Sequence, residues 1–109
     1  MNSRSLEKIR AAARFIATHS EAARLARQHL SEPVQLALSV LESLELEQKT
    51  APEIARSLGI SSESVRQILR ALAWNPEDGG IKIHITYGNG KNAGYSLLKG
   101  KIIWQEPTT

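Results

Sequence analysis

The stretch 50–72 contains two short amphipathic helical patterns separated by a single glycine, and it constrains the fold more than any other feature. Thr50 and Glu53, with Pro52 between them, have the spacing of a capping box that starts the first helix. Gly59 is expected to end that helix, because glycine tolerates the positive φ that reverses a chain. The two helices are therefore predicted to pack across one another at a tight turn.

The second helix of the pair begins at a serine cap and is predicted to run to about Trp74. Ser61 or Ser62 supplies the cap. Apolar residues recur every three or four positions, which predicts one buried stripe: Val65, Ile68, Leu69 and Leu72. Asn75 and Pro76 stop the helix, since a residue before proline avoids the helical region.

The segments that flank this pair predict an α+β fold. A helix over 31–44 is apolar around much of its circumference, so it should lie deep in the core. Beyond the pair, residues 81–87 alternate between apolar and polar, which predicts a strand. A polar turn over 88–94 leads to a returning strand over 95–98, and 102–104 is a candidate third strand.

The stretch from Thr50 to Leu69, TAPEIARSLGISSESVRQIL, closely resembles the helix-turn-helix of prokaryotic DNA-binding regulators. It has a small residue, Ala55, where the helices cross, and Gly59 in the turn. Together with the elements on either side of this stretch, the resemblance extends over residues 31–98. This longer region resembles the winged helix-turn-helix superfamily, which has a three-helix core followed by a β-hairpin wing. The superfamily broadly includes MarR- and ArsR-type regulators. The sequence has neither the metal-sensing cysteines of ArsR proteins nor the long C-terminal dimerisation helix of MarR proteins, so it matches no single family closely.

This resemblance implies double-stranded DNA as the partner, with the second helix in the major groove. Arg66 suits guanine, Gln67 suits adenine, and Glu63 can accept from cytosine. Arg70 is placed for a phosphate. Hydroxyl groups predicted to face the DNA belong to Thr50, Ser61, Ser62 and Ser64. Wing residues predicted to reach the minor groove or backbone are Lys82, Asn89, Lys91 and Asn92. The alternative is that all these side chains are simply solvated.

Residues 65–68 also resemble the DNA-reading helix of the last sigma-factor region. That region is part of a longer protein and carries no wing. A shared form of recognition helix is therefore the simpler interpretation.

Residues 1–30 form a basic amphipathic segment, expected as two helices or as one bent helix. Its role is open between a DNA-contacting arm, a dimerisation helix and a lid on the core. Dimerisation combined with packing on the domain is favoured, which makes a homodimer on a near-palindromic site the expected state. The remaining chain divides into a winged helix-turn-helix domain over 31–104 and a flexible tail over 105–109.

The net charge of +3 is distributed unevenly along the chain. Residues 1–30 carry six basic and two acidic groups, and residues 81–109 carry four basic and one acidic group. Residues 31–80 carry four basic and eight acidic groups. The basic ends should attract a polyanion, whereas the acidic middle is unfavourable for a surface that faces phosphates.

Other classes of function lack support in the sequence. The chain has no cysteine, no apolar run long enough to span a membrane and no apolar signal core, so we expect a cytoplasmic protein without membrane contact. His19, His29 and His84 lack the spacing of metal ligands. Glu45 and Glu47 are placed in a short connector without a catalytic partner. We therefore expect no enzyme activity, no cofactor and no small-molecule effector.

Two functional hypotheses follow. The first is sequence-specific binding of double-stranded DNA by a dimeric transcriptional repressor or a plasmid or phage regulator. The alternative is a winged-helix protein–protein interaction or assembly module without direct DNA readout, which the acidic middle segment motivates.

Overall fold

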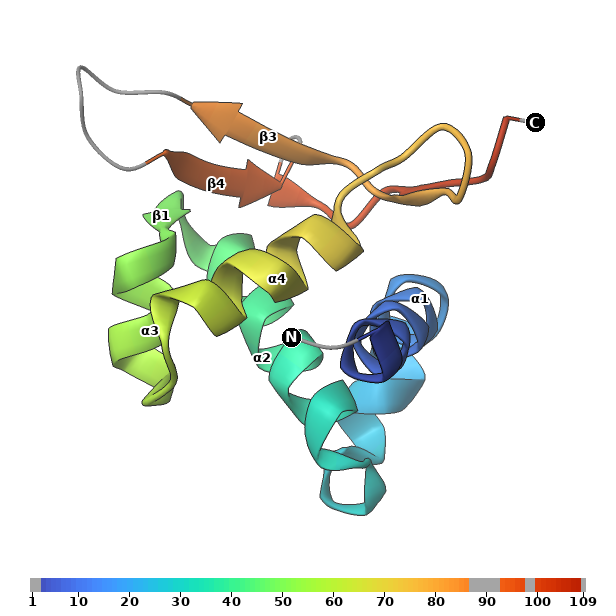
Figure 1. Ribbon diagram of the computed structural model, residues 1–109, viewed down its shortest axis with the longest axis horizontal. Helices are drawn as coiled ribbons and strands as arrows, with labels where there is room; N and C mark the ends of the chain where they lie inside the picture. The colour runs from blue at the N-terminus through green and yellow to red at the C-terminus, as the bar shows by residue number, and fades with distance from the viewer. Residues whose placement is uncertain (1–2, 87–92, 98–99, 109) are drawn as a thin grey trace.

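The computed structural model describes residues 3–86, 93–97 and 100–108. Its helices lie on one side and its strands on the other (Figure 1). The helices are α1 (Ser3–Leu25), a 3₁₀ helix (Arg27–His29), α2 (Glu32–Leu46), α3 (Ala51–Leu58) and α4 (Ser62–Leu72). The strands are β1 (Lys49–Thr50), β2 (Gly80–Ile81), β3 (Ile83–Thr86), β4 (Gly94–Leu97) and β5 (Trp104–Gln105). The prediction of an α+β chain is confirmed.

The N-terminal segment is one helical stretch with a bend, which answers a question that the sequence left open. The bend lies at His19, whose φ of −133° and ψ of 37° fall outside the helical region. The hydroxyl of Thr18 lies 2.8 Å from Nδ1 of His19, and the Phe15 ring stacks on the imidazole with centroids 5.2 Å apart. The bend turns the last residues of α1 back toward α2.

Ion pairs fasten the end of α1 to α2. Arg24 forms an ion pair with Glu45, and its Nε lies 3.7 Å from Oε2 of Glu42. Glu42 also forms an ion pair with Arg27. Glu45 thus belongs to the last turn of α2, and its placement in a connector was wrong. The prediction failed because the apolar stripe of α2 fades at Leu46, which is exposed, although the helix continues to that residue.

The caps of α3 and α4 form as the sequence predicts. The Thr50 hydroxyl accepts from the N–H of Glu53 at 3.3 Å, and the Glu53 carboxylate accepts from the N–H of Thr50 at 3.0 Å. Gly59 ends α3 with a φ of 70°. The Ser61 hydroxyl accepts from the N–H of Ser64 at 3.1 Å. Helix α4 stops at Leu72, two residues before the predicted end.

The main sheet has the strand order β1-β4-β3, and both pairings are antiparallel. The predicted strand over 81–87 is broken at Lys82, whose N–H donates to the carbonyl of Ile103 at 3.1 Å. Strand β2 pairs instead with β5 in a separate two-stranded sheet, in the register Ile81 to Trp104. The candidate third strand therefore begins two residues later than predicted and does not extend the β3–β4 pair.

The C-terminal residues are attached to the fold. Gln105 lies in β5. Both the N–H and the hydroxyl of Thr108 donate to the carbonyl of Pro76, at 2.7 Å and 3.0 Å. Gln105 and Thr108 of the segment 105–109, predicted to be a flexible tail, are thus held by the fold, and Thr109 lies outside the described residues.

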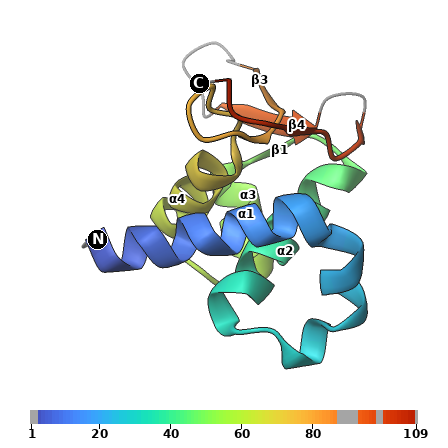
Figure 2. The same ribbon diagram turned by 90° about the vertical axis from the view of Figure 1, so that its right-hand side faces the viewer.

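One hydrophobic core joins the four described α-helices to β2 and β4. Helix α1 crosses α2 and α4 (Figures 1 and 2). The largest fully buried side chains are those of Ile16, Leu38, Val40, Leu41, Leu44, Ile54, Val65, Leu72 and Ile81. Because Ile16 is among them, α1 completes the same core that α2 and α4 share. The Cα radius of gyration is 13.1 Å, as expected for about 100 residues packed around one core.

Candidate nucleic-acid interface

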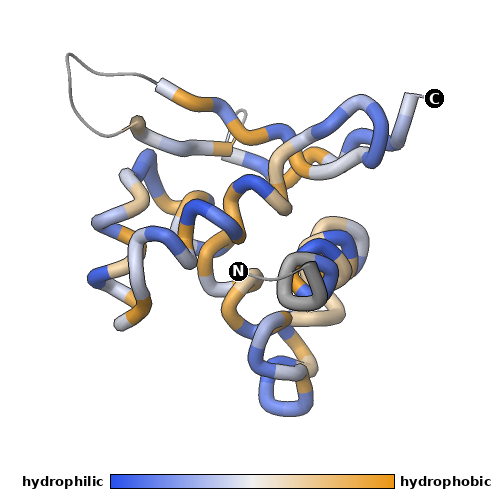
Figure 3. Tube along the Cα trace, in the orientation of Figure 1, coloured by the Kyte–Doolittle hydropathy of each residue, from blue (hydrophilic) through white to orange (hydrophobic). Residues whose placement is uncertain are grey.

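Helix α4 presents a polar side opposite its buried stripe. The predicted stripe of Val65, Ile68, Leu69 and Leu72 is buried. Since successive residues turn by about 100°, Glu63, Gln67 and Arg70 fall on the opposite side. Glu63 and Arg70 are exposed and Gln67 is half-buried. Figure 3 shows the resulting alternation of hydrophilic and hydrophobic residues along α4.

Gln67 is held in place within this polar side. Its Nε2 donates to the Glu63 carboxylate at 2.8 Å. A primary amide has two N–H donors and a carbonyl acceptor, so one donor and the acceptor remain for a ligand. Glu63 therefore orients Gln67 in addition to carrying a negative charge on this side of the helix.

Arg66 lies toward the strands and is half-buried. With Arg70 it lines a cavity of about 250 Å³ between α4 and the β3–β4 pair, whose other walls are Leu69, Ala73, Ile83, Ile85 and Tyr95. The long arginine side chain thus packs its stem against apolar groups, as amphipathic side chains commonly do. The spacing along the helix predicts Arg66 on the outward side and gives no sign of this packing.

The three predicted serines have different positions. Ser61 is exposed, and its hydroxyl lies 2.8 Å from the Ser64 hydroxyl. Ser62 is half-buried. Ser64 is also half-buried and faces an apolar groove of about 250 Å³ between α1, α2 and α4, together with Ile9 and Ile68. Ser64 therefore lies on the flank toward α1 and not beside Gln67.

Thr50 is engaged in the capping box, with its backbone in β1 and its hydroxyl on the N–H of Glu53. The backbone N–H of Thr50, as the largest cause, and the Thr50 hydroxyl hold the pKa of Glu53 below its usual value. Lys49 and Arg56 act in the same direction. Arg56 on α3, which acts on Glu53, is an exposed cation that was not among the predicted DNA contacts.

Lys82 stands beside an aromatic ring at the base of β3. Its Nζ lies 5.7 Å from the centroid of the Trp74 ring. Trp74 is 37% exposed and Ile85 is 39% exposed, and both line a shallow hollow with Lys82 and His84. This apolar patch was not predicted, because the alternation over 81–87 implies that every isoleucine faces the core. The strand instead runs outward from the core beyond Ile83.

Asn89, Lys91 and Asn92 lie outside the residues that the structure describes. Strand β3 ends before that segment and β4 begins after it. In the register of the two strands, Ile85 lies opposite Tyr95 and Thr86 lies opposite Gly94. Those three contacts stay predictions.

The geometry of the described residues does not support the other kinds of site. No group of three or more His, Asp or Glu side chains comes together there as a metal site would require. Within the same residues, no helix combines the length and the apolar character needed to cross a membrane. Comparison with models of protein families, with curated proteins and with solved structures finds no match to this chain.

Proposed function

We propose that the chain is a winged helix-turn-helix protein that binds double-stranded DNA in a sequence-specific manner. The single observation that carries this proposal is the polar side of α4, where Glu63, Gln67 and Arg70 lie opposite the buried stripe. An α-helix with such a side fits the major groove, where the base edges carry a distinct pattern of donors and acceptors. Gln67 would read a base, and Arg70 would contact a phosphate or a base.

The order of the elements supports the same proposal. Helices α2, α3 and α4 are followed by the antiparallel β3–β4 pair, and the short strand β1 joins that pair through β4. Three helices followed by a hairpin is the order of a winged helix. In this arrangement Arg66, between α4 and the strands, would be positioned at the junction of recognition helix and wing.

Helix α1 leaves the polar side of α4 accessible. It packs against the flank that bears Ile68 and Ala71, as the groove and cavity between the two helices show. Glu63 and Arg70 stay exposed. A helix that entered the major groove would thus have α1 on one flank and the β3–β4 pair on the other.

The net negative charge of residues 31–80 overstates the repulsion that DNA would meet from this segment. Glu42 and Glu45 pair with Arg24 and Arg27, and Glu47 lies 3.6 Å from Lys49. Glu53 is held in the capping box of α3. Half of the eight acidic groups of this segment are therefore engaged by basic groups or backbone of the protein itself.

We further propose that the protein acts as a homodimer in the cytoplasm, as a repressor or a plasmid or phage regulator. Leu25 and Leu46 support the dimer, because they are 92% and 84% exposed at the ends of two helices joined by the Arg24–Glu45 ion pair. Large apolar side chains this exposed are candidates for coverage by a second copy of the chain. Sedimentation of the wild type and of Leu25→Ser with Leu46→Ser measures this directly, since loss of the interface halves the mass.

A binding titration on genomic fragments at two salt concentrations tests the DNA proposal. Each phosphate that the protein neutralises adds about 0.9 to the slope of log affinity against log salt, so binding should weaken steeply as salt rises. Retention of a partner protein at high salt, with no DNA complex at low salt, would contradict the proposal.

The second candidate is a protein-interaction module, favoured by the apolar patch of Trp74 and Ile85. A partner that binds there would be lost in Trp74→Ala with Ile85→Thr. DNA binding through α4 would be retained in that variant, so the two functions separate.

A further inference from the structure

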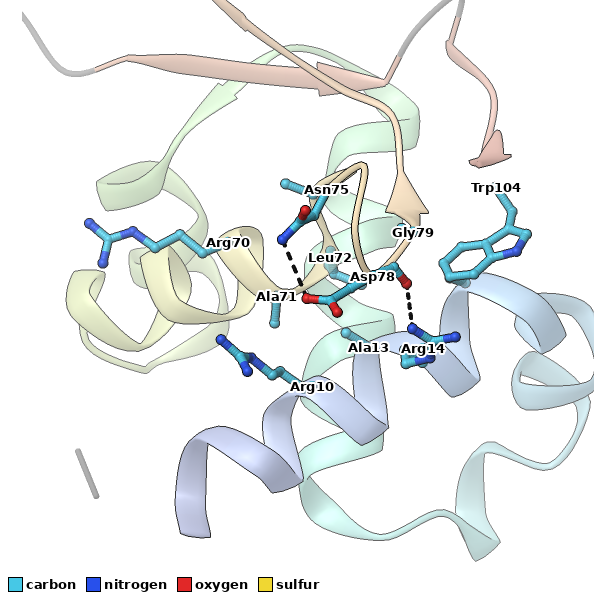
Figure 4. Close-up of a pocket in the computed structure, with 13 residues that line it drawn as sticks. Arg10, Ala13, Arg14, Arg70, Ala71, Leu72, Asn75, Asp78, Gly79 and Trp104 are labelled. Atoms are coloured by element: carbon cyan, nitrogen blue, oxygen red, sulfur yellow. Dashed lines mark hydrogen bonds between the residues drawn. The ribbon is translucent and has the colours of Figure 1, made fainter. Parts of the chain in front are cut away.

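Three arginines line a cavity between α1 and the end of α4, on the far side of α4 from the strand-side cavity of Arg66. The cavity measures about 200 Å³, and its charged walls come from Arg10 and Arg14 of α1 and Arg70 of α4. Figure 4 shows Arg10 and Arg14 rising from α1 beside the loop that carries Asp78. Trp104 closes one end, with the Arg14 guanidinium 5.5 Å from its ring centroid.

The side chains that line this cavity carry an excess of positive charge. Arg10 and Arg14 are four residues apart, so they lie on the same face of α1, where like charges destabilise a helix. Among the described residues that line the cavity, only Asp78 has an acidic side chain. No carboxylate in the described part of the chain forms an ion pair with any of the three arginines, in contrast to Arg24 and Arg27.

Part of this charge has a structural use. A guanidinium N–H of Arg14 donates to the backbone carbonyl of Asp78, and the Asn75 amide lies 3.3 Å from the Asp78 carboxylate (Figure 4). These contacts tie the loop after α4 to α1. Arg10 and Arg70 take no part in them, and both are exposed.

We propose that this cavity binds a phosphate group, held by Arg10 and Arg14 with Arg70 closing over it from the rim. Arginine presents several N–H donors in a planar fork that matches the oxygens of phosphate. The cavity is smaller than the roughly 300–1,000 Å³ of sites for drug-sized ligands, so it suits a small group. The Arg70 side chain extends along α4 in Figure 4, and because it is exposed it is free to turn toward the cavity.

Two sources can supply this phosphate: the backbone of a nucleic acid or a free phosphate anion. Arg70 also lines the cavity on the strand side of α4. It therefore links the phosphate site to the polar side of the helix, and α1 would contact a nucleic-acid backbone beside the recognition helix. The site itself does not depend on the proposed DNA function, because a free anion would bind the same arginines.

Tryptophan fluorescence provides the direct test. The chain has two tryptophans, so Trp74→Phe leaves Trp104 as the sole reporter at the cavity. Titration of this variant with inorganic phosphate, at an ionic strength held constant with chloride, should change the Trp104 emission in a saturable way. Adding Arg10→Gln should weaken binding about tenfold, the loss expected for one charged hydrogen bond. Lys101→Gln, an equal change of charge at an exposed residue outside the cavity, should have no effect.

DNA titrations of Arg10→Gln and Lys101→Gln identify the source. If the phosphate belongs to the nucleic-acid backbone, the slope of log affinity against log salt should become about 0.9 less steep in Arg10→Gln and stay unchanged in Lys101→Gln. An unchanged slope, with inorganic phosphate binding weakened, assigns it to a free anion. Saturable phosphate binding without any DNA complex would support the phosphate site and contradict the proposed DNA function. Emission that does not saturate, or that saturates equally in the Arg10→Gln and Lys101→Gln variants, overturns the site.

Discussion

The side-chain amide of Gln67 donates a hydrogen bond of 2.8 Å to the carboxylate of Glu63, one turn earlier in α4. This contact ties the residue best suited to read adenine to the acidic residue that phosphates disfavour. Glu63 thus has two opposing effects in the proposed complex. It orients Gln67 and it repels the DNA backbone.

Replacing Glu63 by Ala separates these effects. Affinity for random duplexes should rise, because a negative charge leaves the surface. Discrimination between a specific site and random DNA should fall by about 1–3 kcal/mol, the worth of one well-oriented base contact. Competition binding measures both. Glu21→Ala removes an equal charge from an exposed residue of α1 and is the control. Equal discrimination between specific and random DNA in the two variants would show that Glu63 does not contribute to base reading.

Replacing Gly59 by Ala should destabilise the fold by about 1–2 kcal/mol, because an L side chain is strained at its φ of 70°. A Cβ at this position meets nothing within 4 Å, so the loss comes from strain alone. Gly100→Ala has a similar φ of 66° and equal free space, and should lose a similar amount. Urea unfolding measures both, and only Gly59→Ala should also weaken DNA binding. A Gly59→Ala protein of full stability would contradict the left-handed turn.

The capping box predicts a pH dependence of stability. Because hydrogen bonds from Thr50 lower the pKa of Glu53 in the folded state, the ionised cap stabilises the protein above the unfolded pKa, near 4.5. This contribution is lost as the pH falls through the lower folded value. The difference in unfolding free energy between wild type and Glu53→Gln should therefore shrink below about pH 4.5. A difference that is constant between pH 7 and pH 3 would show that the carboxylate charge has no role.

Lys82 should contribute one phosphate contact from the base of β3. In Lys82→Gln the salt slope of DNA binding should fall by about 0.9, with equal losses on specific and random duplexes. Gln keeps a polar chain above Trp74, so the fold should be retained. An unchanged slope would indicate that Lys82 serves only to cover the Trp74 ring.

The helix pair was predictable because its signals are local. The capping box of Thr50 and Glu53, the turn at Gly59 and the cap at Ser61 each depend on residues within a few positions, and all three formed. The buried stripe of α4 follows from its spacing in the same way. Local chemistry therefore located both helices of the pair.

Other features depend on contacts between distant segments, which the sequence pattern does not contain. The break at Lys82 exists because β2 pairs with β5, more than 20 residues further along the chain. Ser64 was expected beside the DNA, but α1 packs against its flank of α4. The cavity that we propose binds phosphate is lined by Arg10 and Arg14 of α1 and Arg70 of α4, and only the crossing of α1 over α4 puts these residues around one cavity.

Selection of bound fragments from genomic DNA, followed by affinity measurements with Gln67→Ala, tests whether the polar side of α4 reads a DNA sequence. The wild type should enrich a shared sequence. Gln67→Ala should lose about 1–3 kcal/mol of affinity for that sequence and much less for random duplexes. A folded wild-type protein that enriches no sequence and binds no duplex at low salt would rule out sequence-specific DNA binding.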